Sequence, residues 1–383
     1  MQGLEDRSRH LGRARCRGCG GRAAGSDAGT RSGRSVTRMS SREGRRRRGF
    51  VRFCPLSRAT SVEIPRAGSR PLMNAPFQPI AAPADPAQVL AEIGQLGHRG
   101  VYASQGRFDV FLAAAWEIPA VLHEIGRLRE VAFRAVGEGS GKALDLDAFD
   151  ASYLHLFLWD REARQVAGGY RLGCTDILLP AGGPGALYTS TLFRFEQAFL
   201  DFLKPGLELG RSFVAPDYQR SIHPLGLLWR GIGRFVAERP RYARLFGPVS
   251  ISRDYSAVSQ DLMVRFLRDR RQNPAMAGWV HPHHPYGGLP DGQGISRHLQ
   301  SIEEVSAAVA DAEPDRKGVP VLLRQYLKLN ATLLEFSVDP AFSDVLDALV
   351  MVDLREAPSG VLARYMGEEG HRAFIAATAR SAA

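Results

Sequence analysis

The chain has 383 residues, enough for one large domain or two small ones, and its formal net charge is +10. The charge is uneven, because residues 1–72 hold 18 arginines, no lysine and five acidic residues, so this segment carries +13 and the rest carries −3. No apolar run is long enough to span a bilayer, and the arginine-rich start lacks the apolar stretch of a secretory signal. We therefore expect a cytoplasmic protein, either soluble or peripherally associated with the inner membrane.

Residues 1–72 are predicted to form a disordered tail, because a segment rich in Arg, Gly and Ser has too little apolar surface to offset the entropy of ordering. Three interpretations remain open: a nucleic-acid-binding arm, an arginine-rich transit peptide, or a translation start set too far upstream, with Met73 as the true start. We favour the late start and expect no nucleic acid among the partners. Cys16 and Cys19 form a C-x-x-C pair without a second pair at zinc spacing, so no metal is expected.

A Pro/Ala-rich linker is predicted over residues 73–105, and a folded domain over residues 106–383. The first half of this domain is expected to hold a strand over 106–115, a helix from Pro119 to Val136 ended by Gly137, a hairpin of strands over 153–159 and 165–172, a glycine-rich loop at 182–185 and a short helix over 193–203.

The second half is organised around a strand over 207–215, a helix over 224–237 and a strand over 245–252. A strand, a helix and a second strand in this order predict a right-handed parallel crossover. The remaining elements are expected to be helices over 256–271, 301–310 and 320–329, an irregular loop over 273–300 and closing strands over 333–338 and 348–354.

Glu208 and Arg211 lie on the central strand and are the predicted catalytic residues. Side chains alternate along a strand, so these two point to opposite faces unless a β-bulge shifts the parity, and Gly210 is where a bulge is expected. A bulge also frees a backbone N–H, which can hold the oxyanion formed when an amine attacks a thioester. The alternative is an edge strand with two solvated charges.

Three further segments have residue types that suit a binding site. Arg220, Ser221 and Gly226 flank the start of a helix, whose N–H groups and dipole favour a phosphate, although an ordinary helix cap is the alternative. The loop over 144–150 contains Asp145, Asp147 and Asp150, which suit a metal or a cationic substrate, or are simply solvated. The histidines in the loop after residue 280 lack partners for a zinc site, so we expect a surface loop or a lid.

Four motifs follow one another along the chain in the order that is typical of a known family. They are L-R-E-V-A-F at 128–133, D-L-D-A-F-D at 145–150, G-G-Y-R-L at 168–172 and E-L-G-R-S-F-V at 208–214. They resemble the acyl-homoserine-lactone synthases, acyl-carrier-protein-dependent members of the GNAT acyltransferase fold. From Phe108 to about Phe374, including ISRDYSAVSQDLMVRFL at 251–267, the chain more closely resembles the hemolysin-like GNAT acyltransferases, which include the L-ornithine N-alpha-acyltransferases of ornithine-lipid synthesis.

The resemblance implies an α/β (α+β) fold with a mixed β-sheet flanked by helices and splayed between its fourth and fifth strands, here 207–215 and 245–252. The thioester would lie in the V-shaped opening. The resemblance places Glu208 at the position of the proposed base. It places Arg211, Arg129 and Arg171 at basic motif positions and Asp147 and Asp150 at an acidic pair, and Phe133 shares a helix face with Arg129.

The resemblance also implies a donor and an acceptor. The acetyl-coenzyme A-binding members have a glycine-rich Q/R-x-x-G-x-G/A turn, whereas this chain has Q-R-S-I-H-P at 219–224, which favours an acyl carrier protein as donor. Arg220, Arg230 and Arg234 would dock this acidic protein, with a solvated helix face as the alternative. The expected reaction moves a 3-hydroxy fatty acyl group to the α-amine of L-ornithine, without a cofactor; the alternatives are another amine, a lysophospholipid, or a nucleic-acid-binding protein.

Overall fold

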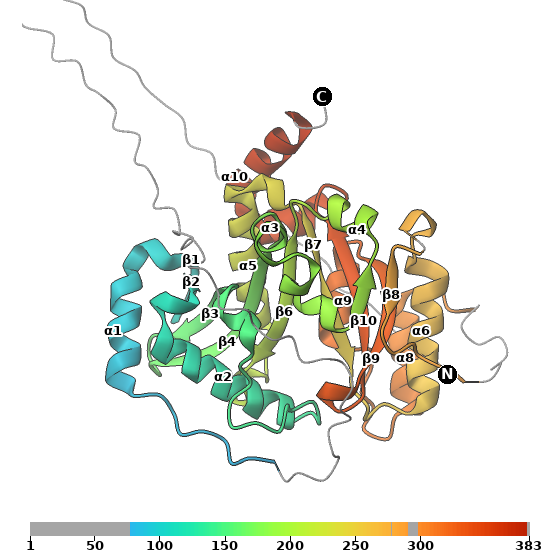
Figure 1. The fold of residues 1–383 in the computed structure, drawn as a ribbon, viewed down its shortest axis with the longest axis horizontal. Helices are drawn as coiled ribbons and strands as arrows, with labels where there is room; N and C mark the ends of the chain where they lie inside the picture. Colours follow the sequence, from blue (N-terminus) through green and yellow to red (C-terminus); the bar gives the residue numbers. More distant parts are fainter. Residues whose placement is uncertain (1–76, 277, 290–297, 381–383) are drawn as a thin grey trace, which may run out of the picture. The chain divides into compact units, whose positions relative to one another are not determined.

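The computed structural model describes residues 77–276, 278–289 and 298–380, and a mixed sheet of eight strands runs through them (Figure 1). The strand order is β1-β2-β3-β4-β6-β7-β10-β9, and neighbours are antiparallel except for β6 and β7, which are parallel. The strands are β1 (Val101–Gln105), β2 (Phe108–Ala114), β3 (Leu154–Asp160), β4 (Gln165–Cys174), β6 (Leu207–Val214), β7 (Arg244–Ile251), β9 (Thr332–Asp339) and β10 (Val345–Asp353).

Helices cover both faces of this sheet, and a small second sheet pairs β5 (Phe193–Phe195) with β8 (Val280–Pro282). The helices α5 and α10 pack on each other, and α6 packs beside α8 and β9, at the end of the sheet away from α1 (Figure 1). The helices are α1 (Pro86–Leu96), α2 (Pro119–Arg134), α3 (Thr175–Gly182), α4 (Gln197–Phe202), α5 (His223–Glu238), α6 (Ala257–Arg271), α8 (Ile302–Ala312), α9 (Val321–Lys328) and α10 (Ser359–Arg380).

The alternation of side chains along β2 and β3 divides the core into two layers. Leu156 and Leu158 belong to the cluster that packs against α5, whereas Phe157 and Trp159 belong to the cluster under α2. Because both faces of these strands are buried, the strands read as nearly continuous apolar runs rather than as a half-polar pattern. This arrangement fixes α2 and α5 on opposite faces of the sheet.

The sheet is splayed between β6 and β7, as the resemblance implied. These strands pair only at their first residues, Leu207 with Leu245 and Glu208 with Phe246, and then separate. Two features account for the separation: β6 has a bulge after Gly210, and Pro248 in β7 has no N–H to donate to a neighbour. The parallel crossover through α5 is also confirmed.

The strands of the central sheet other than β1, and the helices α2, α5, α6, α8 and α9, confirm the predicted elements to within a few residues. One prediction is wrong in part, because the segment 193–203 is strand β5 followed by helix α4. No element was predicted for the segment before the glycine-rich loop, which forms helix α3. Nothing in the sequence analysis foresaw α10. The predicted tail, with Cys16, Cys19 and Met73, lies outside the described residues.

The predicted linker 73–105 also needs correction, since residues 86–105 form α1 and β1. Asp85 caps α1 by accepting a hydrogen bond from the Ala87 N–H, and Pro86 occupies the first turn. The buried Glu92 carboxylate then accepts the N–H groups of Ala120 and Val121, at the start of α2. Long-range contacts of this kind order a segment that looks like a linker in composition.

Candidate functional site

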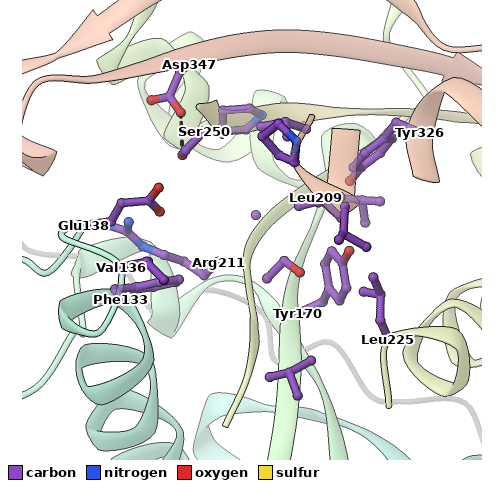
Figure 2. Close-up of a pocket in the computed structure, with 18 of the residues that line it drawn as sticks. Phe133, Val136, Glu138, Tyr170, Leu209, Arg211, Leu225, Ser250, Tyr326 and Asp347 are labelled. Carbon is purple, nitrogen blue, oxygen red and sulfur yellow. Dashed lines mark hydrogen bonds between the residues drawn. The ribbon is translucent and has the colours of Figure 1, made fainter. Parts of the chain in front are cut away.

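A cavity of about 470 Å³ lies in the opening between β6 and β7 (Figure 2). Its polar side includes Arg211, Glu138, Ser250 and Asp347, and its apolar side includes side chains from β4, β6, α5 and α9. Other residues that line the cavity include Phe133, Tyr170, Tyr188, Leu209, Gly210, Ser212, Ser221, Val249, Tyr326 and Phe342.

The bulge in β6 turns Arg211 toward this cavity. Residues 169 and 171 of β4 pair with residues 213 and 210 of β6, so Arg211 and Ser212 together oppose Tyr170. Arg211 itself, rather than Gly210, adopts the left-handed conformation, with φ of 48°. The predicted bulge is therefore confirmed. It places Arg211 on the same side of the strand as Glu208, because Arg211 packs on the Tyr188 ring and Glu208 accepts the N–H of the next residue, Thr189.

The Arg211 guanidinium is held between two aromatic rings and two carboxylates. Its central carbon lies 4.8 Å from the centre of the Tyr188 ring and 4.9 Å from that of Phe342. Its nitrogens lie 3.5 Å from Asp145 and 3.3 Å from Asp147. Burial alone would lower the pKa of this guanidinium, but Tyr188 and the aspartates raise it, so Arg211 is a fixed positive charge in the cavity wall.

A buried network of ion pairs supports Arg211 from behind. Arg129 contacts Asp145 at 2.9 Å and Asp150 at 2.8 Å, and Arg171 contacts Asp147 at 2.5 Å and Asp150 at 3.3 Å. Burial opposes ionisation of Asp145, yet Arg211 and Arg129 hold its pKa below the ordinary value. Three arginines and three aspartates thus compensate one another and fix the position of the Arg211 side chain.

Four residues that were predicted to contact the substrate lie in this network. The four motif residues do come together in the structure: Arg129, Arg171, Asp147 and Asp150. None of them is among the described residues that line the cavity. Arg129, Arg171 and Asp150 are almost fully buried, and both arginines form an ion pair with Asp150. Their geometry is that of a support for Arg211. Phe133, by contrast, does line the cavity.

Glu208 is also part of the support. Its carboxylate accepts hydrogen bonds from the Tyr153 hydroxyl and, at 2.7 Å, from the Thr189 N–H, while the Tyr188 N–H donates to the Tyr153 hydroxyl. These bonds hold Tyr188 against Arg211. Glu208 does not belong to the described residues that line the cavity, and both oxygens of its carboxylate already accept hydrogen bonds.

Two other carboxylates face the cavity, and the sequence analysis selected neither (Figure 2). Asp347 lies on β10 beside Ser250 of β7, whose hydroxyl donates to it at 2.7 Å. Burial, and then the neighbouring Asp339, raise the pKa of Asp347 to about 8. Burial and Asp254 raise the pKa of Glu138 to about 7. The cavity therefore has two carboxyl groups that titrate near neutral pH, opposite a permanent positive charge.

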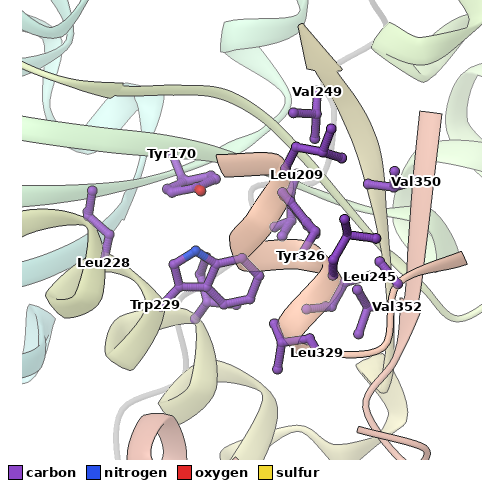
Figure 3. Packing of buried hydrophobic residues seen from close by; sticks show 14 of the residues in the cluster. Tyr170, Leu209, Leu228, Trp229, Leu245, Val249, Tyr326, Leu329, Val350 and Val352 are labelled. Atoms are coloured by element: carbon purple, nitrogen blue, oxygen red, sulfur yellow. The ribbon is translucent and has the colours of Figure 1, made fainter. Parts of the chain in front are cut away.

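Aromatic packing supports the apolar side of the cavity (Figure 3). Trp229, on α5, is buried and contacts Tyr170 with ring centres 6.4 Å apart and Tyr326 with ring centres 5.3 Å apart, both edge to face. Tyr170 and Tyr326 line the cavity together with Leu209 and Val249. This wall suits an apolar chain, because it leaves little exposed polar surface.

The predicted donor-binding residues divide into two groups. Ser221 lines the cavity and accepts a hydrogen bond from the His223 N–H at the start of α5, and the exposed Arg220 is its neighbour. Gly226, in the first turn of α5, faces open space. Arg230 and Arg234, farther along the helix, bond to Gln105 and Glu238 and do not line the cavity.

The other candidate groups bring no further chemistry to the cavity. His155 is buried and donates a hydrogen bond from Nε2 to the Asp150 carbonyl, and burial lowers its pKa to about 4. His281 contacts Glu196, and His283 contacts the Ser190 carbonyl. Within residues 77–276, 278–289 and 298–380, no group of three or more His, Cys, Asp or Glu side chains is placed to hold a metal ion. No helix of the described segments is long and apolar enough to cross a membrane.

The splayed sheet, the bulge and the cavity between β6 and β7 define the class of the domain. Residues 128–230 match the model of the acetyltransferase (GNAT) domain, and this stretch contains α2, the ion-pair network and the bulged strand. This part of the chain is thus similar to a GNAT domain, and the splayed mixed sheet is GNAT-like in its fold.

Among curated proteins, the chain is similar to two bacterial proteins that are named glycine N(alpha)-acyltransferase. It is 37% identical over 172 residues to that of Bacteroides thetaiotaomicron, a match that spans 42% of this chain but only 51% of the relative. It is 28% identical over 297 residues to that of Phocaeicola vulgatus, across 73% of this chain and 90% of the relative.

Solved structures of acyl-homoserine-lactone synthases also resemble the chain at a low level. The CoA-dependent synthase BjaI, with SAM and isopentyl-CoA, shares 13% identity over 69% of this chain and 87% of its own, with a TM-score of 0.32. The synthase LasI shares 16% identity over 43% of this chain and 79% of its own, with a TM-score of 0.28.

Proposed function

We propose that the chain is an N-acyltransferase that moves a 3-hydroxy fatty acyl group from acyl carrier protein to the α-amine of an amino acid, with L-ornithine as the acceptor. The observation that carries the proposal is the cavity at the splay of a GNAT sheet, with one guanidinium and two carboxyl groups on its polar side. The names of the two curated relatives support amino-acid N-acylation as the reaction class.

The donor would enter between the separated strands. Beyond Glu208 and Phe246, β6 and β7 no longer pair, so their facing edges are available to the amide groups of a pantetheine arm. The bulge at Arg211 and Ser212 leaves backbone out of the ladder at the same place, which suits an oxyanion. The acyl chain would lie along the wall formed by Leu209, Val249 and Tyr326.

A carrier protein is the proposed source of the thioester. The start of α5 has no glycine-rich turn for a coenzyme A pyrophosphate, but it presents Arg220, Ser221 and an open surface over Gly226 beside the cavity. A single phosphate, which is what a carrier-linked pantetheine has, needs fewer donors than a pyrophosphate. Arg220 is the basic residue closest in sequence to this entrance and would meet the acidic carrier.

The charges of the cavity favour ornithine over glycine. Both amino acids have an α-carboxylate, which Arg211 would bind, and an α-ammonium. Ornithine has a second ammonium, and a buried site accepts one only beside a carboxylate. The cavity provides two carboxyl groups, so one of them, Glu138, is left for the side chain of the acceptor.

The test compares acceptors with the full chain, a 3-hydroxyacyl carrier protein and mass spectrometry of the products. The wild type is expected to N-acylate ornithine, and Glu138→Gln is expected to lower kcat/KM for ornithine by about tenfold or more while changing that for glycine by less than about threefold. A matched donor without the 3-hydroxyl tests the acyl preference.

Three outcomes would count against parts of the proposal. Faster turnover of glycine than of ornithine would assign this chain the acceptor named in its relatives. Turnover of a lysophospholipid instead of amino acids would change the acceptor class. An intact thioester with every amine would refute N-acyl transfer itself.

A further inference from the structure

We infer that Asp347, and not Glu208, accepts the proton from the attacking amine. The inference deepens the proposed function and rests on it. It assigns the base to a side chain outside the segment 128–230 that matches the GNAT model, on a strand beyond the splay.

The position of Asp347 suits a base in this cavity. Asp347 lies on β10 directly across from Ser250 of β7, and its carboxylate is directed into the cavity on the side that holds Arg211 (Figure 2). One oxygen accepts the Ser250 hydroxyl at 2.7 Å. Within the described part of the chain, the other oxygen has no hydrogen-bond donor, so it is available to an ammonium in the cavity.

The electrostatic surroundings of Asp347 favour the same role. The charged and titratable groups around it are Asp339 on β9, Glu138 after α2, Arg211 on β6 and Tyr188. Burial and the carboxyls of Asp339 and Glu138 disfavour its ionisation, against the hydrogen bond from Ser250 and the charge of Arg211, which favour it. A carboxylate in these surroundings binds a proton far better than one in water, as a base that deprotonates an ammonium near neutral pH must do.

Glu208 differs from Asp347 in the hydrogen bonds that its carboxylate already accepts. Both oxygens of Glu208 already accept hydrogen bonds, from Tyr153 and from the Thr189 N–H, and the side chain lies behind Tyr188. A substrate amine would have to displace those donors to reach it. Asp347 needs no such rearrangement.

Transfer of the acyl group to the amine moves two protons and exchanges one C–S bond for one C–N bond. The α-ammonium gives one proton to Asp347, and the neutral amine attacks the thioester carbonyl, so that a C–N bond forms. The C–S bond then breaks, and the second amine proton goes to the leaving thiolate. Asp347 returns its proton to solvent, so each turnover yields an amide, a thiol and one released proton.

The test compares Asp347→Asn with the wild type, using two nucleophiles and a pH series. The first is the amino acid acceptor, whose amine must lose a proton. The second is hydroxylamine, which is largely unprotonated at neutral pH and needs no base. Asp347→Asn is expected to lower kcat for the amino acid by about 10²–10⁴-fold at pH 7 with little change in KM, and to change hydroxylamine turnover by less than about threefold.

The pH profile gives a second readout. The wild-type rate is expected to reach half of its maximum near pH 8 and to level off above that pH, whereas the residual rate of Asp347→Asn should rise only with the pKa of the free amine. An equal loss with both nucleophiles would make Asp347 a structural residue and overturn the inference.

A matched variant, Glu208→Gln, separates the two carboxylates. A selective loss with the amino acid in Glu208→Gln, together with full activity in Asp347→Asn, would return the role of base to Glu208. A wild type that forms no N-acyl product would refute the proposed function and this inference together, whereas a wild type that is active alongside a fully active Asp347→Asn would refute this inference alone.

Discussion

Replacing Asp347 by Asn should stabilise the protein, and increasingly so as the pH rises. The pKa of Asp347 is raised from 3.8 to about 8, so the folded state binds this proton more tightly than the unfolded chain does. For an acid with a raised pKa, the cost to folding is absent below the unfolded pKa, grows as the pH rises from about 4 to about 8, and is then constant.

The magnitude follows from the two pKa values. The penalty is on the order of 2 kcal/mol at about pH 5 and on the order of 6 kcal/mol at about pH 9. The free energy of unfolding of Asp347→Asn should therefore exceed that of the wild type by a margin that widens by on the order of 4 kcal/mol over this range. Asparagine can still accept the Ser250 hydroxyl, so little is lost in packing.

Urea unfolding of both proteins at the two pH values measures this margin. A margin that stays constant with pH, or a variant that is less stable at about pH 9, would refute the reasoning that Asp347 is ionised against its surroundings. The same measurement shows whether Asp347→Asn folds, so its activity can be interpreted.

Three other substitutions test the site. Gly247→Ala would place a Cβ 2.0 Å from the Leu209 carbonyl oxygen, so we expect the free energy of unfolding to fall by about 3 kcal/mol or more. The control is Gly210→Ala, whose Cβ would have nothing within 4 Å. Equal losses in the two variants would contradict the close approach at Gly247. Asp145→Asn removes the carboxylate that pairs with Arg129 and Arg211. Above pH 4 this change should raise KM for the amino acid about tenfold. An unchanged KM would show that the network does not position Arg211. Gly226→Ala should stabilise α5 by about 0.5–1 kcal/mol and raise KM for the carrier protein; an unchanged KM would place the phosphate elsewhere.

Much of the sheet was predictable from local patterns. The hairpin of β3 and β4, the bulged strand and the crossover through α5 each have a clear period, a turn or a glycine signal. Segments whose order depends on distant partners were not predictable. The helix α1 looks like a Pro/Ala linker because its main anchor, Glu92, bonds to the N–H groups of α2.

The site shows the same division. The motif residues Arg129, Arg171 and Arg211 come together as expected, but only the three-dimensional structure separates the cavity wall from the buried support behind it. Asp347 did leave a signal in the sequence, as a carboxylate in the apolar run VLDALVMV. That run gives no indication that a strand two positions along the sheet from β6 faces the same cavity.

The most direct test of the central claim is a crystal structure of the full chain with N-acyl-ornithine. We expect the product to lie in the opening between β6 and β7, with its carboxylate on Arg211, its amide nitrogen near Asp347 and its acyl chain along Leu209 and Tyr326. A product bound elsewhere, with this cavity empty, would contradict the account.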